Sequence, residues 1–254
     1  MAARIVLLLL LGLLSAGYAA AQTLSVAAAS DLQAVLPALA ERFDRQSGVT
    51  TRVTLGSSGN FFSQIQNGAP FDVFMSADLD YPRHLVAAGA AVPDSLYEYG
   101  SGRLVLWARR DAGIDVRRGL QLLTDARVRR IAIANPEHAP YGRAAVAALR
   151  HQNVYASVQS KLVLGENISQ AAQFVQSGNA DVGILALSVA LAPALKASGV
   201  YSEIPADWHP PIRQAAVIVG ASKNQKAARD FLAFLKQPAS LQLLADFGFA
   251  VRRE

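Results

Sequence analysis

The sequence lacks cysteine entirely, although it has 254 residues. This absence excludes disulfide bonds, thiolate metal sites and a cysteine nucleophile. It also excludes a lipid attached to an N-terminal cysteine. We therefore expect an exported form of this chain to carry no lipid anchor and to be soluble.

Charged residues are also sparse, at 17% of the chain, and aromatic residues make up only 7%. The formal net charge is +5, but many of the basic residues occur as separate pairs with acidic residues between them. A nucleic-acid site needs basic residues gathered on one face, with aromatic residues among them. We therefore expect no nucleic-acid partner. The basic pairs are Arg109-Arg110, Arg117-Arg118, Arg129-Arg130 and Arg252-Arg253.

A long hydrophobic run lies near the N-terminus. Arg4 precedes an apolar stretch at residues 5–14, and three alanines follow at 19–21. This order is typical of a secretory signal peptide, and the run is well short of the ~20 residues that cross a bilayer as a helix. We predict a signal peptide over residues 1–21, a mature protein that begins at Gln22, and a periplasmic location.

Strand and helix patterns alternate along the rest of the chain. With 52% hydrophobic residues, the chain can fill one large or two modest cores. Residues 24–89 show three strand–helix units, which predicts a mainly parallel sheet flanked by helices. A second set begins at residue 104 without a Pro/Ser-rich linker, so we predict two lobes with a hinge of crossing strands. The predicted strands cover residues 24–29, 49–55, 70–78, 104–107, 131–134, 162–164, 181–187, 200–204 and 215–219, and residues 100–102 are predicted as a loop.

Two short runs each join a predicted strand to a predicted helix. The first, Ala27-Ala28-Ala29-Ser30-Asp31, precedes a helix predicted over residues 32–43, with Ser30 and Asp31 at the capping positions. The second is Gly56-Ser57-Ser58-Gly59-Asn60. A helix N-terminus has unpaired N–H groups and the positive end of the helix dipole, so it favours anions. Neither run contains lysine or arginine, which predicts an oxyanion site built from neutral donors.

A serine at the start of a helix is also an ordinary cap, so each run alone is weak evidence of function. The pair is stronger evidence, because ligands of open α/β sheets gather at the carboxyl ends of strands. Two later turns, residues 135–142 and 165–167, also lie between a predicted strand and a predicted helix.

Five motifs in combination point to one family. Their sequences are Ala27-Ala28-Ala29-Ser30, Gly56-Ser57-Ser58-Gly59 with Gln64-Ile65 after it, Asp72-Val73-Phe74-Met75-Ser76-Ala77-Asp78, Asn135-Pro136-Glu137-His138-Ala139-Pro140-Tyr141-Gly142 and Phe247-Gly248-Phe249. With these motifs the chain resembles the periplasmic molybdate-binding proteins of ABC transporters, the ModA-like substrate-binding proteins. The resemblance covers essentially the whole predicted mature chain.

The resemblance implies a two-lobed periplasmic-binding-protein fold of type II, with the ligand in the cleft between the lobes. Lobe one would comprise residues 22–103 and 214–254, and lobe two residues 104–213. The implied function is capture of molybdate, or of tungstate of nearly the same size, for delivery to an ABC permease. We expect a monomer without a cofactor, in which molybdenum is bound only as the oxyanion.

The resemblance also implies the ligand-binding residues. In lobe one these are Ser30 and Ser58, through hydroxyl and backbone N–H groups, and in lobe two Tyr141 and Ile168, through backbone N–H groups. Many family members have a tyrosine whose hydroxyl contacts the oxyanion where this chain has Ala186. Two alternatives remain open: the Tyr141 hydroxyl replaces that donor, or the site makes one hydrogen bond fewer.

Three other functions are compatible with parts of this sequence. Sulfate, thiosulfate or phosphate would use the same neutral turns. Ferric iron would need clustered tyrosines with a histidine or carboxylate, but only Tyr97 and Tyr99 are close in the sequence. A serine hydrolase would need Ser58 beside a base such as His138, but Gly-Ser-Ser-Gly is not the Gly-x-Ser-x-Gly elbow. We therefore expect a binding protein and not an enzyme.

Overall fold

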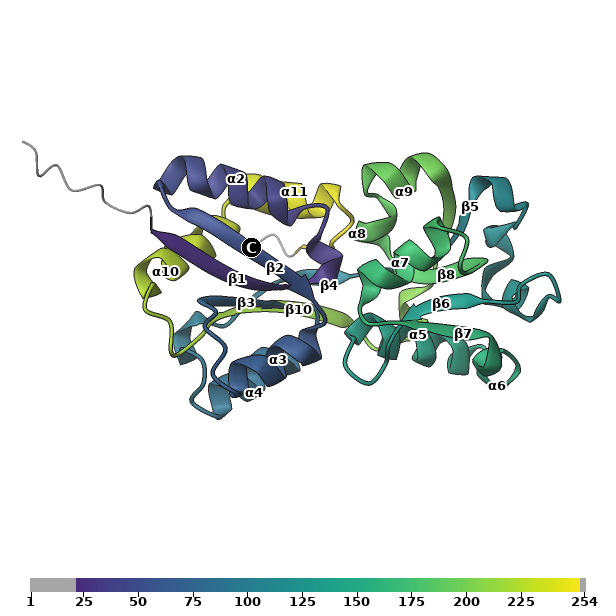
Figure 1. Cartoon of the computed structure of the whole chain (residues 1–254), viewed down its shortest axis with the longest axis horizontal. Coiled ribbons are helices and arrows are strands. Elements are labelled where there is room, and N and C mark those ends of the chain that lie inside the picture. Colours follow the sequence, from purple (N-terminus) through teal and green to yellow (C-terminus); the bar gives the residue numbers. More distant parts are fainter. Residues whose placement is uncertain (1–21, 252–254) are drawn as a thin grey trace, which may run out of the picture.

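The computed structural model describes residues 22–251, which form two lobes that lie side by side (Figure 1). The predicted signal peptide, residues 1–21, lies outside the described residues. Each lobe contains a five-stranded sheet, with strand order β2-β1-β3-β10-β4 in lobe one and β7-β6-β8-β5-β9 in lobe two. The predicted two-lobed α/β fold is therefore confirmed. Within residues 22–251, no helix has the length and apolar character needed to cross a membrane.

In lobe one, β1 pairs in parallel with β2 and β3, and β10 runs antiparallel between β3 and β4. Because strand side chains alternate between faces, Ala28 packs in the core under α2, α10 and α11, and Ala27 packs under α3 and α4 (Figure 1). The elements are β1 (Thr23–Ala29), β2 (Thr50–Gly56), β3 (Val73–Ser76), β4 (Tyr97–Gly102), β10 (Ile212–Ile218), α2 (Leu36–Ser47), α3 (Ser58–Gln66), α4 (Asp80–Ala87), α10 (Gln225–Leu235) and α11 (Pro238–Asp246), with the 3-10 turns η1 (Ser30–Leu32) and η2 (Pro93–Ser95).

Lobe two repeats this arrangement of strand directions. β6 is parallel to β7 and β8, and β5 is antiparallel to β8 and β9. Its core surrounds the fully buried Trp107. The elements are β5 (Leu104–Arg109), β6 (Ile131–Ala134), β7 (Leu162–Gly165), β8 (Val182–Ala186), β9 (Gly199–Glu203), α5 (Pro140–His151), α6 (Tyr155–Val158), α7 (Ile168–Gln176), α8 (Leu187–Ala190) and α9 (Pro193–Ser198), with η3 (Arg110–Ala112), η4 (Val116–Thr124), η5 (Gln159–Lys161) and η6 (Ala206–Trp208).

The chain passes between the sheets twice, once from β4 to β5 and once from β9 to β10. β10 joins the first sheet from Ile212 onward, where it pairs with Gly102. We propose that lobe one comprises residues 22–103 and 214–254 and that lobe two comprises residues 104–213, with these two passages as the hinge. Ile212 and Arg213, which already pair with β4, belong to the second passage.

Two local predictions were wrong. Residues 100–102 form the end of β4 and pair with β10, because ladder pairing outweighs the low strand preference of glycine. The helix predicted over residues 32–43 begins only at Leu36, after the 3-10 turn η1. Ser30 and Asp31 do not cap it; the Ser30 hydroxyl and the Asp31 carboxylate instead accept hydrogen bonds from distant residues.

Candidate functional site

A small cavity lies between the lobes. The space in it that the centre of a water molecule can occupy is about 10 Å³. This volume is about that needed for one water molecule, so the space between the lobes is small in the closed form. The four predicted residues Ser30, Ser58, Tyr141 and Ile168 all line it, so the structure brings them together. The other lining residues are Ala29, Asp31, Gly56, Ser57, Ala77, Ala139, Pro140 and Asn167.

Three helices begin at this cavity. α3 begins at Ser58, α7 begins at Ile168, and α5 begins at Pro140, which places Tyr141 second. The first N–H groups of a helix have no acceptor within the helix, and proline at the first position has no N–H to leave unpaired. The backbone N–H groups of Ser58, Tyr141 and Ile168 are therefore donors at the positive ends of three helices.

Two serine hydroxyls add donors to the cavity wall. Ser58 Oγ is buried and accepts a hydrogen bond of 2.9 Å from the Ala77 N–H. Ser30 Oγ accepts one of 3.4 Å from the Ser169 N–H across the lobes. A hydroxyl that accepts a hydrogen bond still has its own hydrogen to donate. The cavity can therefore present hydroxyl and N–H donors from both lobes to one anion.

Asp31 is the one charged residue among the described residues that line the cavity, and it is fully buried. Its Oδ2 accepts hydrogen bonds from the Tyr141 hydroxyl (2.9 Å) and from Gln214 Nε2 (2.6 Å). Its Oδ1 has no partner within residues 22–251. Burial raises the pKa of Asp31 to about 6, although these two hydrogen bonds and the nearby backbone N–H groups of Asp31 and Leu32 act in the opposite direction. Sequence reasoning interpreted Asp31 as a cap; the single acid in an otherwise neutral run was the available signal.

We expect Asp31→Asn to raise the free energy of unfolding of the ligand-free protein at pH 7 by about 1–3 kcal/mol. The carboxyl has a pKa near 3.8 when exposed and about 6 when folded, so ionisation destabilises the folded state. The stabilising effect of the neutral form is complete below about pH 4 and is lost as the pH rises through about 6. Urea unfolding at pH 4 and pH 7 measures this, and an equal effect of the substitution at both pH values would contradict it.

The Tyr141 hydroxyl is already occupied in this network. It donates to Asp31 and accepts from Gln214 at 3.0 Å, and burial beside Asp31 raises its pKa well above the usual value, so it stays neutral. Ala186 is fully buried at the end of β8 and does not line the cavity. In this arrangement the Tyr141 hydroxyl is therefore not free to replace a tyrosine at position 186.

Several contacts hold the cleft closed around the cavity. The Gly59 N–H of lobe one donates to the His138 carbonyl of lobe two at 2.9 Å. His138 Nδ1 lies 3.0 Å from Ser57 Oγ, and the Ser188 hydroxyl donates to the Asp31 carbonyl at 2.8 Å. The hydrogen-bonded serine of His138 is thus Ser57, and this pair joins the two lobes. This pair must separate whenever the lobes open, so it can stabilise only the closed form.

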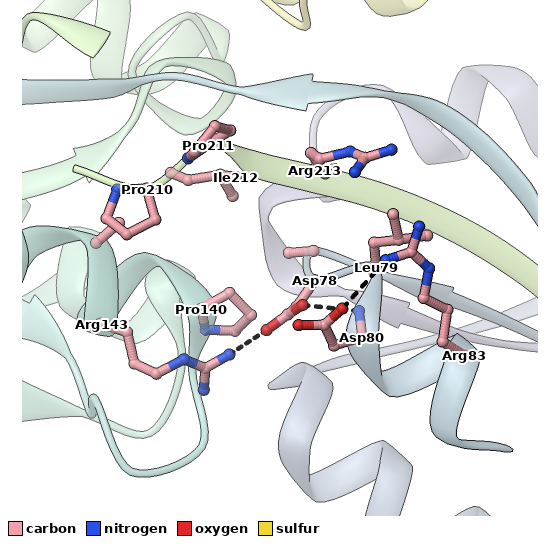
Figure 2. A pocket seen from close by; sticks show the side chains of 12 residues that line it. Asp78, Leu79, Asp80, Arg83, Pro140, Arg143, Pro210, Pro211, Ile212 and Arg213 are labelled. Carbon is pink, nitrogen blue, oxygen red and sulfur yellow. Dashed lines mark hydrogen bonds and ion pairs between the residues drawn. The ribbon is translucent and has the colours of Figure 1, made fainter. Parts of the chain in front are cut away.

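A larger hollow of about 350 Å³ lies nearby, and Figure 2 shows its lining side chains. It shares Ala77 and Pro140 with the small cavity. Its three arginines each have a carboxylate partner: Arg143 with Asp78, Arg83 with Asp80, and Arg213 with Glu98. The positive charges of this hollow are therefore already paired with carboxylates. Within residues 22–251, no three His, Cys, Asp or Glu residues are grouped so that they could hold a metal ion.

Two lobes closed around a small cavity lined by helix N-termini define a solute-binding protein. Residues 24–250 match the family described as bacterial extracellular solute-binding protein, and the chain belongs to that family.

Its relatives include binding proteins for a specific oxyanion. The chain is 37% identical to the molybdate-binding protein ModA of Azotobacter vinelandii over 98% of both chains. It is 40% identical to that of Rhodobacter capsulatus over 82% of this chain and 80% of the relative. The solved structure of an Azotobacter vinelandii periplasmic molybdate-binding protein superposes with a TM-score of 0.84 at 33% identity, covering 91% of this chain and all of that one. These relatives are binding proteins, and the expectation that the chain is not an enzyme is confirmed.

Proposed function

We propose that this chain is the periplasmic molybdate-binding component of an ABC transporter. It captures molybdate, or tungstate, in the small cavity and delivers it to the membrane permease as a soluble monomer without a cofactor. The observation that carries the proposal is the convergence of neutral donors from three helix N-termini, with no lysine or arginine among the described lining residues. The molybdate-binding relatives at 37% and 40% identity support the choice of anion.

In this proposal the oxyanion accepts hydrogen bonds from the hydroxyl and N–H groups of Ser30 and Ser58 and from the N–H groups of Tyr141 and Ile168. A hydrogen bond to a charged group contributes roughly 1.5–3 kcal/mol. About six such bonds support submicromolar binding, which requires roughly 8 kcal/mol, after dehydration and closure are subtracted. Molybdenum is bound only through the oxygen atoms of the ion.

Closure follows from the division of donors between the lobes. Each lobe alone offers only part of the donor set, so the anion stabilises the closed form by bridging both parts. Neutral donors hold the ion without a fixed counter-charge, which allows release when the permease separates the lobes. A cavity of fixed donors also selects by size, because a smaller sulfate cannot reach all of them at once.

A thermal melt of the mature protein tests this function directly. Molybdate, tungstate, sulfate and phosphate are each added at 1 mM. A ligand at about 1,000 times its dissociation constant adds about 4 kcal/mol of stability, or roughly 10 °C in Tm for a chain of this size. We expect this rise with molybdate and tungstate but not with sulfate or phosphate. A rise with sulfate or phosphate alone would replace the proposed anion.

We expect Ser58→Ala to weaken molybdate binding by about tenfold or more, because the variant loses a hydroxyl that donates to a charged ligand (~1.4 kcal/mol or more). Titration calorimetry measures the change in Kd. Ser63→Ala is the matched control, since Ser63 lies on the exposed face of the same helix. An unchanged Kd in Ser58→Ala would remove Ser58 from the ligand set.

A further inference from the structure

The carboxyl group of Asp31 presents two unequal oxygen atoms to its surroundings. Oδ2 accepts both hydrogen bonds, from the Tyr141 hydroxyl and Gln214 Nε2, whereas Oδ1 has no partner within residues 22–251. Asp31 also lines the small cavity together with the serine and helix-start donors. A proton on this carboxyl would therefore sit on Oδ1, because Oδ2 already accepts two donors. That proton would be available to a ligand oxygen.

No positive charge offsets this carboxyl. The carboxyl accepts hydrogen bonds from Tyr141 of α5 and Gln214 of β10. Ser188 of α8 donates to the backbone carbonyl of Asp31, and the hydroxyl of Tyr99 on β4 donates to Gln214 at 2.8 Å. The two tyrosines are the titratable groups that face this carboxyl, and burial raises the pKa of both well above 10, so both stay neutral. No lysine, arginine or histidine of the described chain forms an ion pair with Asp31. An ionised Asp31 would therefore repel a dianion in the same cavity.

We propose that the site binds its oxyanion together with one proton, which is held between Asp31 Oδ1 and an oxygen of the bound ion. This inference rests on the proposed function, which supplies the identity of the anion. It adds a role for Asp31: the site accepts the anion only when this carboxyl is protonated. The proton comes from solvent, and no bond between heavy atoms forms or breaks. The proton replaces a repulsion with a charge-assisted hydrogen bond.

The expected signature is a linkage between pH and affinity. In the ligand-free closed form burial places the pKa of Asp31 at about 6, and a neighbouring dianion raises it further. Above about pH 6.5 each molybdate therefore takes up one proton, and Kd rises by up to tenfold per pH unit. Below the pKa that Asp31 has before the anion binds, Asp31 is already protonated, and this dependence on pH disappears.

Titration calorimetry of the mature protein with molybdate between pH 6.5 and 8.5, in two buffers of different protonation enthalpy, measures both Kd and proton uptake. We expect an uptake approaching one proton per anion and a Kd that rises by up to 100-fold across this range. Asp31→Asn should take up no proton, keep a nearly constant Kd, and bind at least tenfold more tightly than the wild type at pH 8.5. Asp111→Asn, a change at an exposed aspartate of lobe two, is the matched control and should keep the wild-type pH profile.

Molybdate binding without proton uptake in the wild type would overturn this inference and leave the proposed function intact. Retention of the wild-type pH slope by Asp31→Asn would overturn it as well. Binding of sulfate or phosphate in place of molybdate, still with proton uptake, would support the role of Asp31 while it overturned the proposed anion. The wild-type measurement needs no variant, so the test does not depend on the folding of Asp31→Asn.

Discussion

Gly59→Ala is expected to weaken molybdate binding by at least about 100-fold, or about 2.7 kcal/mol, while each lobe keeps its own packing. A Cβ at Gly59 would lie 2.7 Å from the His138 carbonyl oxygen and 2.9 Å from His138 Cβ, both on the opposite lobe. The Gly59 N–H also donates to this carbonyl in the closed form. Alanine would therefore hold the lobes apart, and one anion could no longer contact the donors of both. The third close atom, the Tyr81 hydroxyl at 2.8 Å, ends a side chain that can turn aside.

Titration calorimetry measures the loss of affinity, and small-angle scattering shows whether molybdate still makes the molecule more compact. Gln66→Ala is the control, because Gln66 is an exposed residue of the same helix, α3. Alanine favours a helix over glycine by about 1 kcal/mol, so the Tm of ligand-free Gly59→Ala should not fall. Tight molybdate binding by Gly59→Ala, with normal compaction, would show that the lobes can close without the close approach of residue 59 to His138.

Gly142→Ala is expected to lower the free energy of unfolding by about 3 kcal/mol or more, with a fall in Tm of roughly 6–12 °C. Gly142 is the third residue of α5, where helix propensity alone would favour alanine by about 1 kcal/mol. A Cβ there would lie 2.1 Å from the Ala134 carbonyl oxygen and 2.8 Å from the Pro136 nitrogen. Both are backbone atoms at the end of β6, so the start of α5 would have to move. This would also displace the Tyr141 N–H and weaken molybdate binding.

Thermal unfolding of the ligand-free protein measures the effect. Ala147→Gly on the same helix provides the comparison: it should cost only about 1 kcal/mol, the difference in helix propensity. A Gly142→Ala protein as stable as the wild type would mean that the turn from β6 to α5 can relax, and the close approach would then not constrain this site.

Much of the anion site was predictable because its parts are local. The serine runs end strands β1 and β2, and the carboxyl ends of neighbouring parallel strands meet at one edge of a sheet. Tyr141 and Ile168 occupy the same position in the second sheet, after β6 and β7, and the family resemblance implied both of them. All four residues line one cavity, as the combination of turns and motifs predicted. Their roles as ligands remain proposals.

The network around Asp31 was not predictable in this way. It joins residues from η1, β4, α5, α8 and β10, with up to 183 positions between partners in the sequence. The single acid in a neutral run was a signal that Asp31 is unusual. It could not show whether Asp31 caps a helix or is buried, because the partners of its carboxyl lie 110 and 183 positions away in the sequence. Gly100 and Gly102 of β4 were missed as strand residues because their pairing partners on β10, Gln214 and Ile212, are distant in the sequence. A Cβ at Gly102 would lie 2.0 Å from the Tyr141 hydroxyl, which belongs to the other lobe.

The sequence by itself determined the alternation of strands and helices, the two lobes, and the donors at the strand–helix turns, because hydrophobic periodicity and capping are local effects. Only the tertiary structure decided which atoms face one another across the cleft. Closure buries Asp31 without a counter-charge, brings Gly59 against His138, and commits the Tyr141 hydroxyl to Asp31. These contacts depend on the relative position of two separate sheets, and that position is fixed by packing between residues far apart in the chain.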